Sequence, residues 1–144
     1  MKLKFKENKV FPKEIDVGKR NWGKETLLAL ISKKISLKKI QIKKGKKGGL
    51  QFHHKKNECG YIISGKLKVT FDLGDKKLKS KILSEGDCFH FPPGLVHQEE
   101  AITSCEIIEA STPHFNDRVR VEEKYGFKKK SGLKSTLKKN VVLK

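Results

Sequence analysis

Two stretches of the chain decide its fold and its candidate site: GKKGGLQFHHKKNECGYIISG at residues 45–65 and GDCFHFPPGLVH at residues 86–97. Gln51 and His53 are two residues apart, so on a strand their side chains point to the same face. Glu58 follows a short polar turn, and His97 follows the Pro-Pro-Gly turn that ends a second apolar strand. Imidazole nitrogens with carboxylate and amide oxygens suit a borderline divalent metal ion. The two stretches therefore predict one metal-binding pocket.

Length and composition indicate one globular domain. The chain has 144 residues, of which 35% are hydrophobic, enough for a single core. No apolar run approaches a membrane span, and the basic N-terminal segment is not followed by an apolar region, so we expect no membrane contact and no secretory signal. Three cysteines, Cys59, Cys88 and Cys105, form no Cys-x-x-Cys pair, and their odd number favours reduced thiols in a cytoplasmic protein.

The net charge of +18 raises the question of nucleic-acid binding, which the residue types argue against. Only Arg20, Arg118 and Arg120 among the 34 basic residues are arginine, the residue that specific base and phosphate readers favour. The lysines are spread along the chain, and no nucleic-acid-binding motif accompanies them. We therefore expect no specific nucleic-acid partner, but a general attraction for anionic small molecules.

Hydrophobic residues alternate with a period of two rather than 3.6, which favours strands over helices. Short strands separated by glycine and proline turns are typical of an all-β sandwich or barrel. The alternation slips at Lys38 and Lys39, which a β-bulge would explain. Strands are expected near residues 26–31, 35–42, 50–54, 59–64, 66–71, 77–83, 88–91, 98–101 and 105–110, followed by a helical turn within 119–125.

Three segments are expected along the chain: an N-terminal arm at residues 1–24, a barrel at 25–127 and a basic tail at 128–144. The tail has seven lysines, no acidic residue and few apolar ones, so we expect it to be disordered. The apolar strand at 26–31 would form a sheet edge that needs cover, which favours a homodimer.

The two quoted stretches resemble the paired motifs of the cupin superfamily. The first motif is matched by Gly45, Gln51, His53, Glu58 and Gly65, and the second by Gly86, Pro92, Gly94 and His97. The position that usually holds the final asparagine of the second motif is Ala101. The resemblance implies a double-stranded β-helix, or jelly-roll barrel, with a divalent metal ion inside it. It also implies four metal ligands, namely Gln51, His53, Glu58 and His97.

A second alignment of the first motif makes His54 a ligand in place of His53. It puts Phe52 at the preceding ligand position, where a hydrocarbon side chain cannot bind metal. Strand alternation instead places Gln51 and His53 on the inner face and His54 on the opposite one. We therefore expect His53, and not His54, to point into the barrel.

The pairing of Gln51 with His53 resembles the mannose-6-phosphate isomerase branch of the cupins. LQFHHKKNE at 50–58, NDRVRVEEKYG at 116–126 and the early Trp22-Gly23 resemble segments of the bifunctional phosphomannose isomerase and sugar-nucleotide pyrophosphorylase enzymes. Phe127 stands where those enzymes usually have a basic residue. The 144 residues leave no room for their nucleotidyltransferase domain, so an isomerase-like pocket is implied and pyrophosphorylase activity is not.

The resulting hypothesis is a sugar-phosphate isomerase or a related carbohydrate-modifying enzyme. Its metal ion, with zinc favoured over manganese, iron or nickel, would polarise the substrate carbonyl. Asp117 and Glu109 are the candidates for the base, and Arg118 and Arg120 for phosphate binding. A surface salt bridge to Glu122 or Glu123 is the alternative role for the two arginines. The alternative functions are a non-catalytic sugar-binding or regulatory cupin of polysaccharide metabolism and a metal-dependent dioxygenase.

Overall fold

The structure is a computed structural model that describes residues 13–14, 21–31, 33–115 and 117–128. Except for Lys128, the expected tail lies outside the described residues. The described part is all-β apart from one 3-10 turn, and none of its helices is long and apolar enough to cross a membrane. Its elements are β1 (Lys13–Glu14), β2 (Gly23–Ile31), β3 (Ile35–Ile42), β4 (Gln51–His53), β5 (Glu58–Ser64), β6 (Leu67–Asp72), β7 (Lys79–Leu83), β8 (Cys88–Phe91), β9 (Val96–Ala101), β10 (Cys105–Ser111), β11 (Arg118–Arg120) and the 3-10 helix η1 (Glu122–Tyr125).

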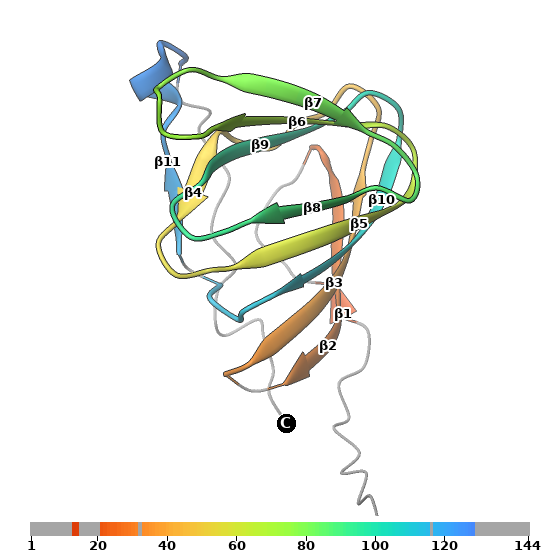
Figure 1. Cartoon of the computed structure of the whole chain (residues 1–144). Helices are drawn as coiled ribbons and strands as arrows, with labels where there is room; N and C mark the ends of the chain where they lie inside the picture. Colours follow the sequence, from red (N-terminus) through yellow and green to blue (C-terminus); the bar gives the residue numbers. More distant parts are fainter. Residues whose placement is uncertain (1–12, 15–20, 32, 116, 129–144) are drawn as a thin grey trace, which may run out of the picture.

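The strands form two antiparallel sheets that face each other across the interior (Figure 1). One sheet has the order β1-β2-β3-β10-β5-β8, and the other has the order β11-β4-β9-β6-β7. Neighbouring strands in each sheet are mostly distant in sequence, because the chain crosses from one sheet to the other as it winds. This is the jelly-roll barrel that the sequence predicts.

The interior changes from apolar to polar along the strands. On β3 the inward residues run from Ser36 and Lys38 to Ile40 and Ile42, and all four are buried. The antiparallel register places Glu109 of β10 opposite Lys38, so polar residues on neighbouring strands line up. One end of the barrel is therefore a hydrophobic core and the other a polar cavity. The core consists of Ile40, Ile42, Ile62, Leu67, Val69, Leu83, Phe91, Ala101, Cys105 and Ile107.

The expected bulge at Lys38 and Lys39 is wrong. Strand β3 pairs without interruption with β10, and the irregularity lies on β2, between Leu27 and Ala29. Because β3 keeps its alternation, Lys38 points inward and only 4% of it is exposed. The pattern of hydrophobic residues could not predict the burial of Lys38, because lysine is normally a surface residue.

Two short segments close the barrel edges. The two-residue β1, which falls within the expected N-terminal arm, pairs with Thr26 and Leu27 and covers part of the outer edge of β2. The homodimer expected at this edge stays a prediction. At the other end, β11 pairs with β4, and η1 follows as the expected helical turn. The Tyr125 hydroxyl donates a hydrogen bond to the Asp72 carboxylate, which ties η1 to the end of β6.

Candidate metal centre

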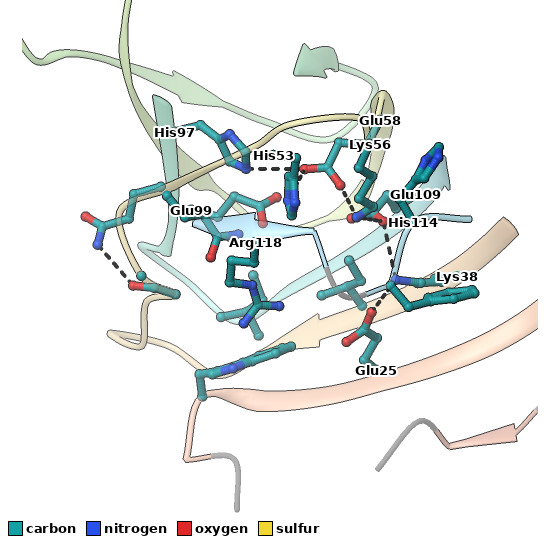
Figure 2. Close-up of a pocket in the computed structure, with 18 residues that line it drawn as sticks. Glu25, Lys38, His53, Lys56, Glu58, His97, Glu99, Glu109, His114 and Arg118 are labelled. Carbon is teal, nitrogen blue, oxygen red and sulfur yellow. Dashed lines mark hydrogen bonds and ion pairs between the residues drawn. The ribbon is translucent and has the colours of Figure 1, made fainter. Parts of the chain in front are cut away.

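Three buried side chains from three strands converge at the polar end of the barrel (Figure 2). His53 ends β4, Glu58 begins β5 and His97 lies in β9. Their exposed fractions are 6%, 5% and 3%. The Oε1 atom of Glu58 lies 3.2 Å from Nε2 of His97 and 3.7 Å from Nε2 of His53. One carboxylate oxygen therefore faces both imidazoles.

This donor set fits a divalent metal ion. Ligands bound about 2.0–2.2 Å from one tetrahedral or octahedral ion lie about 3–3.6 Å apart, close to the two separations measured here. The three donor atoms lie within 4.8 Å of one another. Two imidazoles and a carboxylate favour Zn²⁺ or a similar borderline ion over Mg²⁺ or Ca²⁺, which prefer oxygen.

The surroundings of the two imidazoles differ. The Nδ1 atom of His97 donates a hydrogen bond to the Leu95 carbonyl oxygen at 2.9 Å, so Nε2 is the ring nitrogen that faces Glu58. The buried Phe91 ring stacks on His97, with the ring centroids 4.1 Å apart. Burial lowers the pKa of His53 to about 4, so its ring is neutral at neutral pH. The buried Nδ1 of His53 has no hydrogen-bond partner among the described residues.

Gln51, the expected fourth ligand, lines the same cavity as the three others. It lies two residues before His53 on β4 and is the direct cross-strand partner of His97. His54 is exposed and makes an edge-on contact with Phe52, with the ring centroids 5.1 Å apart. The inward orientation of His53 is therefore confirmed, and the alternative alignment with His54 inside is wrong.

The cavity that these residues line has a volume of about 90 Å³. It reaches the surface beside the exposed His114 and the partly exposed Trp22 and Phe115. The cavity is thus open to solvent on one side, and a small molecule can enter it from there.

A chain of buried charges of alternating sign runs from the far wall of the cavity to the metal ligands (Figure 2). The Nζ atom of Lys38 lies 2.8 Å from Glu25 and 3.8 Å from Glu109. The Nζ atom of Lys56 lies 3.0 Å from the same Glu109 oxygen and also contacts Oε2 of Glu58. All five residues are at least nine-tenths buried. Each charge in the chain thus has an opposite charge beside it.

The two residues expected as the base have different surroundings. Glu109 lines the cavity, but its carboxylate lies between the ammonium groups of Lys38 and Lys56. Asp117 does not line the cavity. Its carboxylate accepts the backbone N–H groups of His54 at 3.2 Å and of Lys55 and Lys56 at 2.6 Å. Although burial raises the pKa of Asp117, these three donors hold it below its ordinary value. Asp117 therefore fixes the turn between β4 and β5.

The two arginines expected to bind phosphate also have different surroundings. Arg118 of β11 is the cross-strand partner of His53 and lines the cavity. Arg120 lies outside the cavity lining, and its Nε donates to Glu122 at 2.8 Å. The guanidinium lies over Gly49, where an added Cβ would come within 2.0 Å of it. Arg120 thus has the salt-bridge role that was the alternative expectation.

Sequence reasoning missed several polar residues of the cavity wall, among them Glu99, Lys38 and Lys56. Glu99 lies two residues after His97 on β9, so strand alternation alone could have found it. Its Oε1 atom is buried and has no hydrogen-bond partner among the described residues. Burial raises the pKa of Glu99 to about 8. No comparable signal marks the two lysines, which belong to a chain with lysine throughout.

Comparisons with known proteins agree with this arrangement. A family model described as "Cupin domain" matches residues 39–111. Mannose-1-phosphate guanylyltransferase 2 of Escherichia coli O157:H7 is 31% identical over 111 residues, which are 74% of this chain and 22% of that protein. The capsular polysaccharide assembling protein CapF from Staphylococcus aureus superposes with a TM-score of 0.66 at 20% identity, covering 76% of this chain and 31% of that one.

A third match is the oxalate decarboxylase of Bacillus subtilis, studied for its Mn(II) centres. It superposes with a TM-score of 0.63 at 20% identity and covers 78% of this chain and 30% of that one. At 20% identity, the matches to CapF and to oxalate decarboxylase support a shared fold and nothing more specific. The chain spans less than a quarter of the length of the guanylyltransferases that it matches.

Proposed function

The chain belongs to the cupin family, and we propose that it is a metal-dependent isomerase that interconverts aldose and ketose phosphates. The observation that carries this proposal is the convergence of His53, Glu58 and His97 beside Gln51, in a cavity that also contains an arginine and an unpaired carboxyl oxygen. Several of the matched relatives are named as mannose-1-phosphate guanylyltransferases, which supports a sugar phosphate as the substrate class.

The metal would be Zn²⁺ or a similar ion held by Gln51, His53, Glu58 and His97. When bound, such an ion polarises a substrate carbonyl. The chain must then supply the group that moves a proton between the two neighbouring carbons, and Glu99 is our candidate. Its side chain lines the same cavity, it follows His97 on the same face of β9, and its Oε1 is not engaged by another described residue. Glu109 is less suited to act as the base, because its carboxylate is paired with the ammonium groups of Lys38 and Lys56.

Arg118 would bind the substrate phosphate. Its guanidinium offers a planar set of donors that suits phosphate oxygens, and its place beside His53 on the cavity wall is close to the metal ligands. The carbonyl end of the sugar would lie beside the metal ligands, and its phosphate would lie beside Arg118 on the cavity wall.

The test is incubation of the purified protein with a panel of aldose and ketose phosphates, with product measured over time. We expect interconversion that is lost after chelation and in Glu58→Gln. Sugar-phosphate binding should be measured separately, because binding and turnover depend on different interactions. Metal-dependent binding without turnover across the panel would overturn the isomerase proposal.

That outcome would favour the second candidate, a non-catalytic sugar-binding cupin. The observation behind it is that Asp117 and Glu109, the residues first expected to act as base, are engaged in backbone hydrogen bonds and ion pairs. Oxygen consumption by an iron-loaded protein would instead indicate a metal-dependent dioxygenase, for which two histidines and one carboxylate are also a suitable ligand set.

A further inference from the structure

The two oxygens of the Glu58 carboxylate have different neighbours. Oε1 faces the Nε2 atoms of His53 and His97, whereas Oε2 contacts the ammonium group of Lys56. The ammonium is itself held from the other side by Glu109, 3.0 Å away. Lys56 is 8% exposed and lies in the turn between β4 and β5, whose backbone N–H groups donate to the Asp117 carboxylate. The Lys56 ammonium group is therefore held in a fixed position within the site.

We infer that the Lys56 ammonium is an internal counter-ion of Glu58, which turns one oxygen toward the histidines and restricts this carboxylate to binding metal through one atom. The inference rests on the metal role proposed above. In this arrangement Lys56 is a positioning residue, since it acts on the metal site through Glu58. The chain of charges through Glu109 and Lys38 anchors it to the opposite wall.

The same contact bears on the metal-free protein. A buried carboxylate without a partner is strongly destabilising, and many metal sites depend on the ion to neutralise it. Here Lys56 already supplies a positive charge to Glu58 before any metal binds. The barrel should therefore fold without metal, and the ion should add less stability than it would add to an uncompensated carboxylate.

The test compares Lys56→Met with Lys55→Met, a control on the same turn that removes one lysine charge from an exposed side chain. Melting temperatures are measured without metal and with saturating Zn²⁺, and visible absorption spectra are recorded with Co²⁺. We expect Lys56→Met to lower the metal-free melting temperature by about 6–20 °C. The increase in the melting temperature of Lys56→Met on adding Zn²⁺ should be about twice that of the wild type, because the ion replaces the lost positive charge.

The Co²⁺ spectrum reports the positioning role directly. Without Lys56, both Glu58 oxygens can reach the ion, which raises its coordination number and weakens the visible absorption. Lys55→Met should match the wild type in every measurement. If Lys56→Met also matches it, the counter-ion inference is overturned, whereas a wild-type protein that binds neither Zn²⁺ nor Co²⁺ overturns the metal role itself.

A Lys56→Met protein that does not fold without metal is resolved by two further measurements. Folding on addition of Zn²⁺, or in the double variant Lys56→Met/Glu58→Gln, supports the inference, because each removes the uncompensated charge. Failure to fold in both cases overturns it, since the defect would then lie elsewhere than in Glu58.

Discussion

The Nδ1 atom of His97 lies 2.9 Å from the carbonyl oxygen of Leu95, only two residues earlier in the chain. Since a carbonyl oxygen can only accept, Nδ1 must donate its proton there, which leaves Nε2 as the ring nitrogen that faces Glu58. A short-range backbone contact thus sets the orientation of a residue whose proposed function depends on strands that are distant in sequence.

The first prediction follows from this geometry. His97→Ala should sharply reduce the metal content of the purified protein, because it removes one of the four proposed donors. His54→Ala should leave it near the wild-type value, because His54 is exposed on the opposite side of β4. Elemental analysis of both variants checks this. Equal losses would mean that His54 takes part in the site.

The second prediction concerns the amide ligand. Gln51→Ala should weaken metal binding by roughly 10-fold or more, measured by competition with a chromophoric chelator. Gln98→Ala is the matched control, because Gln98 also lines the cavity but donates its amide to the Gly48 carbonyl at 3.0 Å. An equal effect in the two variants would contradict a ligand role for Gln51.

The third prediction separates proton transfer from binding. Glu99→Gln should abolish sugar-phosphate interconversion while metal content and substrate binding stay near wild type, since the amide keeps the shape of the side chain but cannot carry the proton. General acid–base groups typically contribute about 10²–10⁴-fold to a rate. Glu100→Gln is the control, because Glu100 is the next residue along β9 and lies 4.0 Å from Lys68. Unchanged turnover in Glu99→Gln would remove it from the mechanism.

The fourth prediction is a pH dependence of stability. The pKa of Asp117 in the folded protein is held below its ordinary value of 3.8. The Asp117 carboxylate therefore contributes to the free energy of unfolding at pH values above its unfolded-state pKa, and this contribution is lost as the pH falls through its folded-state pKa. Asp117→Asn should therefore cost about 1–3 kcal/mol of unfolding free energy at pH 7 and progressively less in acid. Denaturant titrations over this pH range give both values. A constant difference across the range would contradict the role of the charge.

Asp75→Asn serves as the control for this series. Asp75 is exposed and accepts one backbone N–H, from Lys77 at 3.1 Å. Its replacement should change the unfolding free energy much less than that of Asp117. Similar losses in the two variants would mean that the turn between β4 and β5 does not depend on Asp117.

The strands and the inward placement of His53, Glu58 and His97 could be predicted because alternation and motif spacing act locally. His53 and His97 each follow a strand pattern, and Glu58 follows a turn of fixed length. The buried ion pairs could not be predicted in this way. Lys38 and Lys56 are two among 34 basic residues, and what buries them is the approach of Glu25 and Glu109 from other strands.

The arginines illustrate the same limit. Arg118 and Arg120 share one face of β11, and the sequence treats them alike. Their roles differ because one lies beside His53 and the other over Gly49, whose missing side chain leaves room for the guanidinium. That distinction depends on the register between β11 and β4, which no local pattern contains.

The distribution of residues around the cavity has a consequence for how this protein can diverge. The candidate metal ligands lie on β4, β5 and β9, whereas Trp22, His114 and Phe115 lie where the cavity reaches the surface. We therefore expect substitutions at those three positions to change which molecules enter the cavity while the buried donor set stays intact.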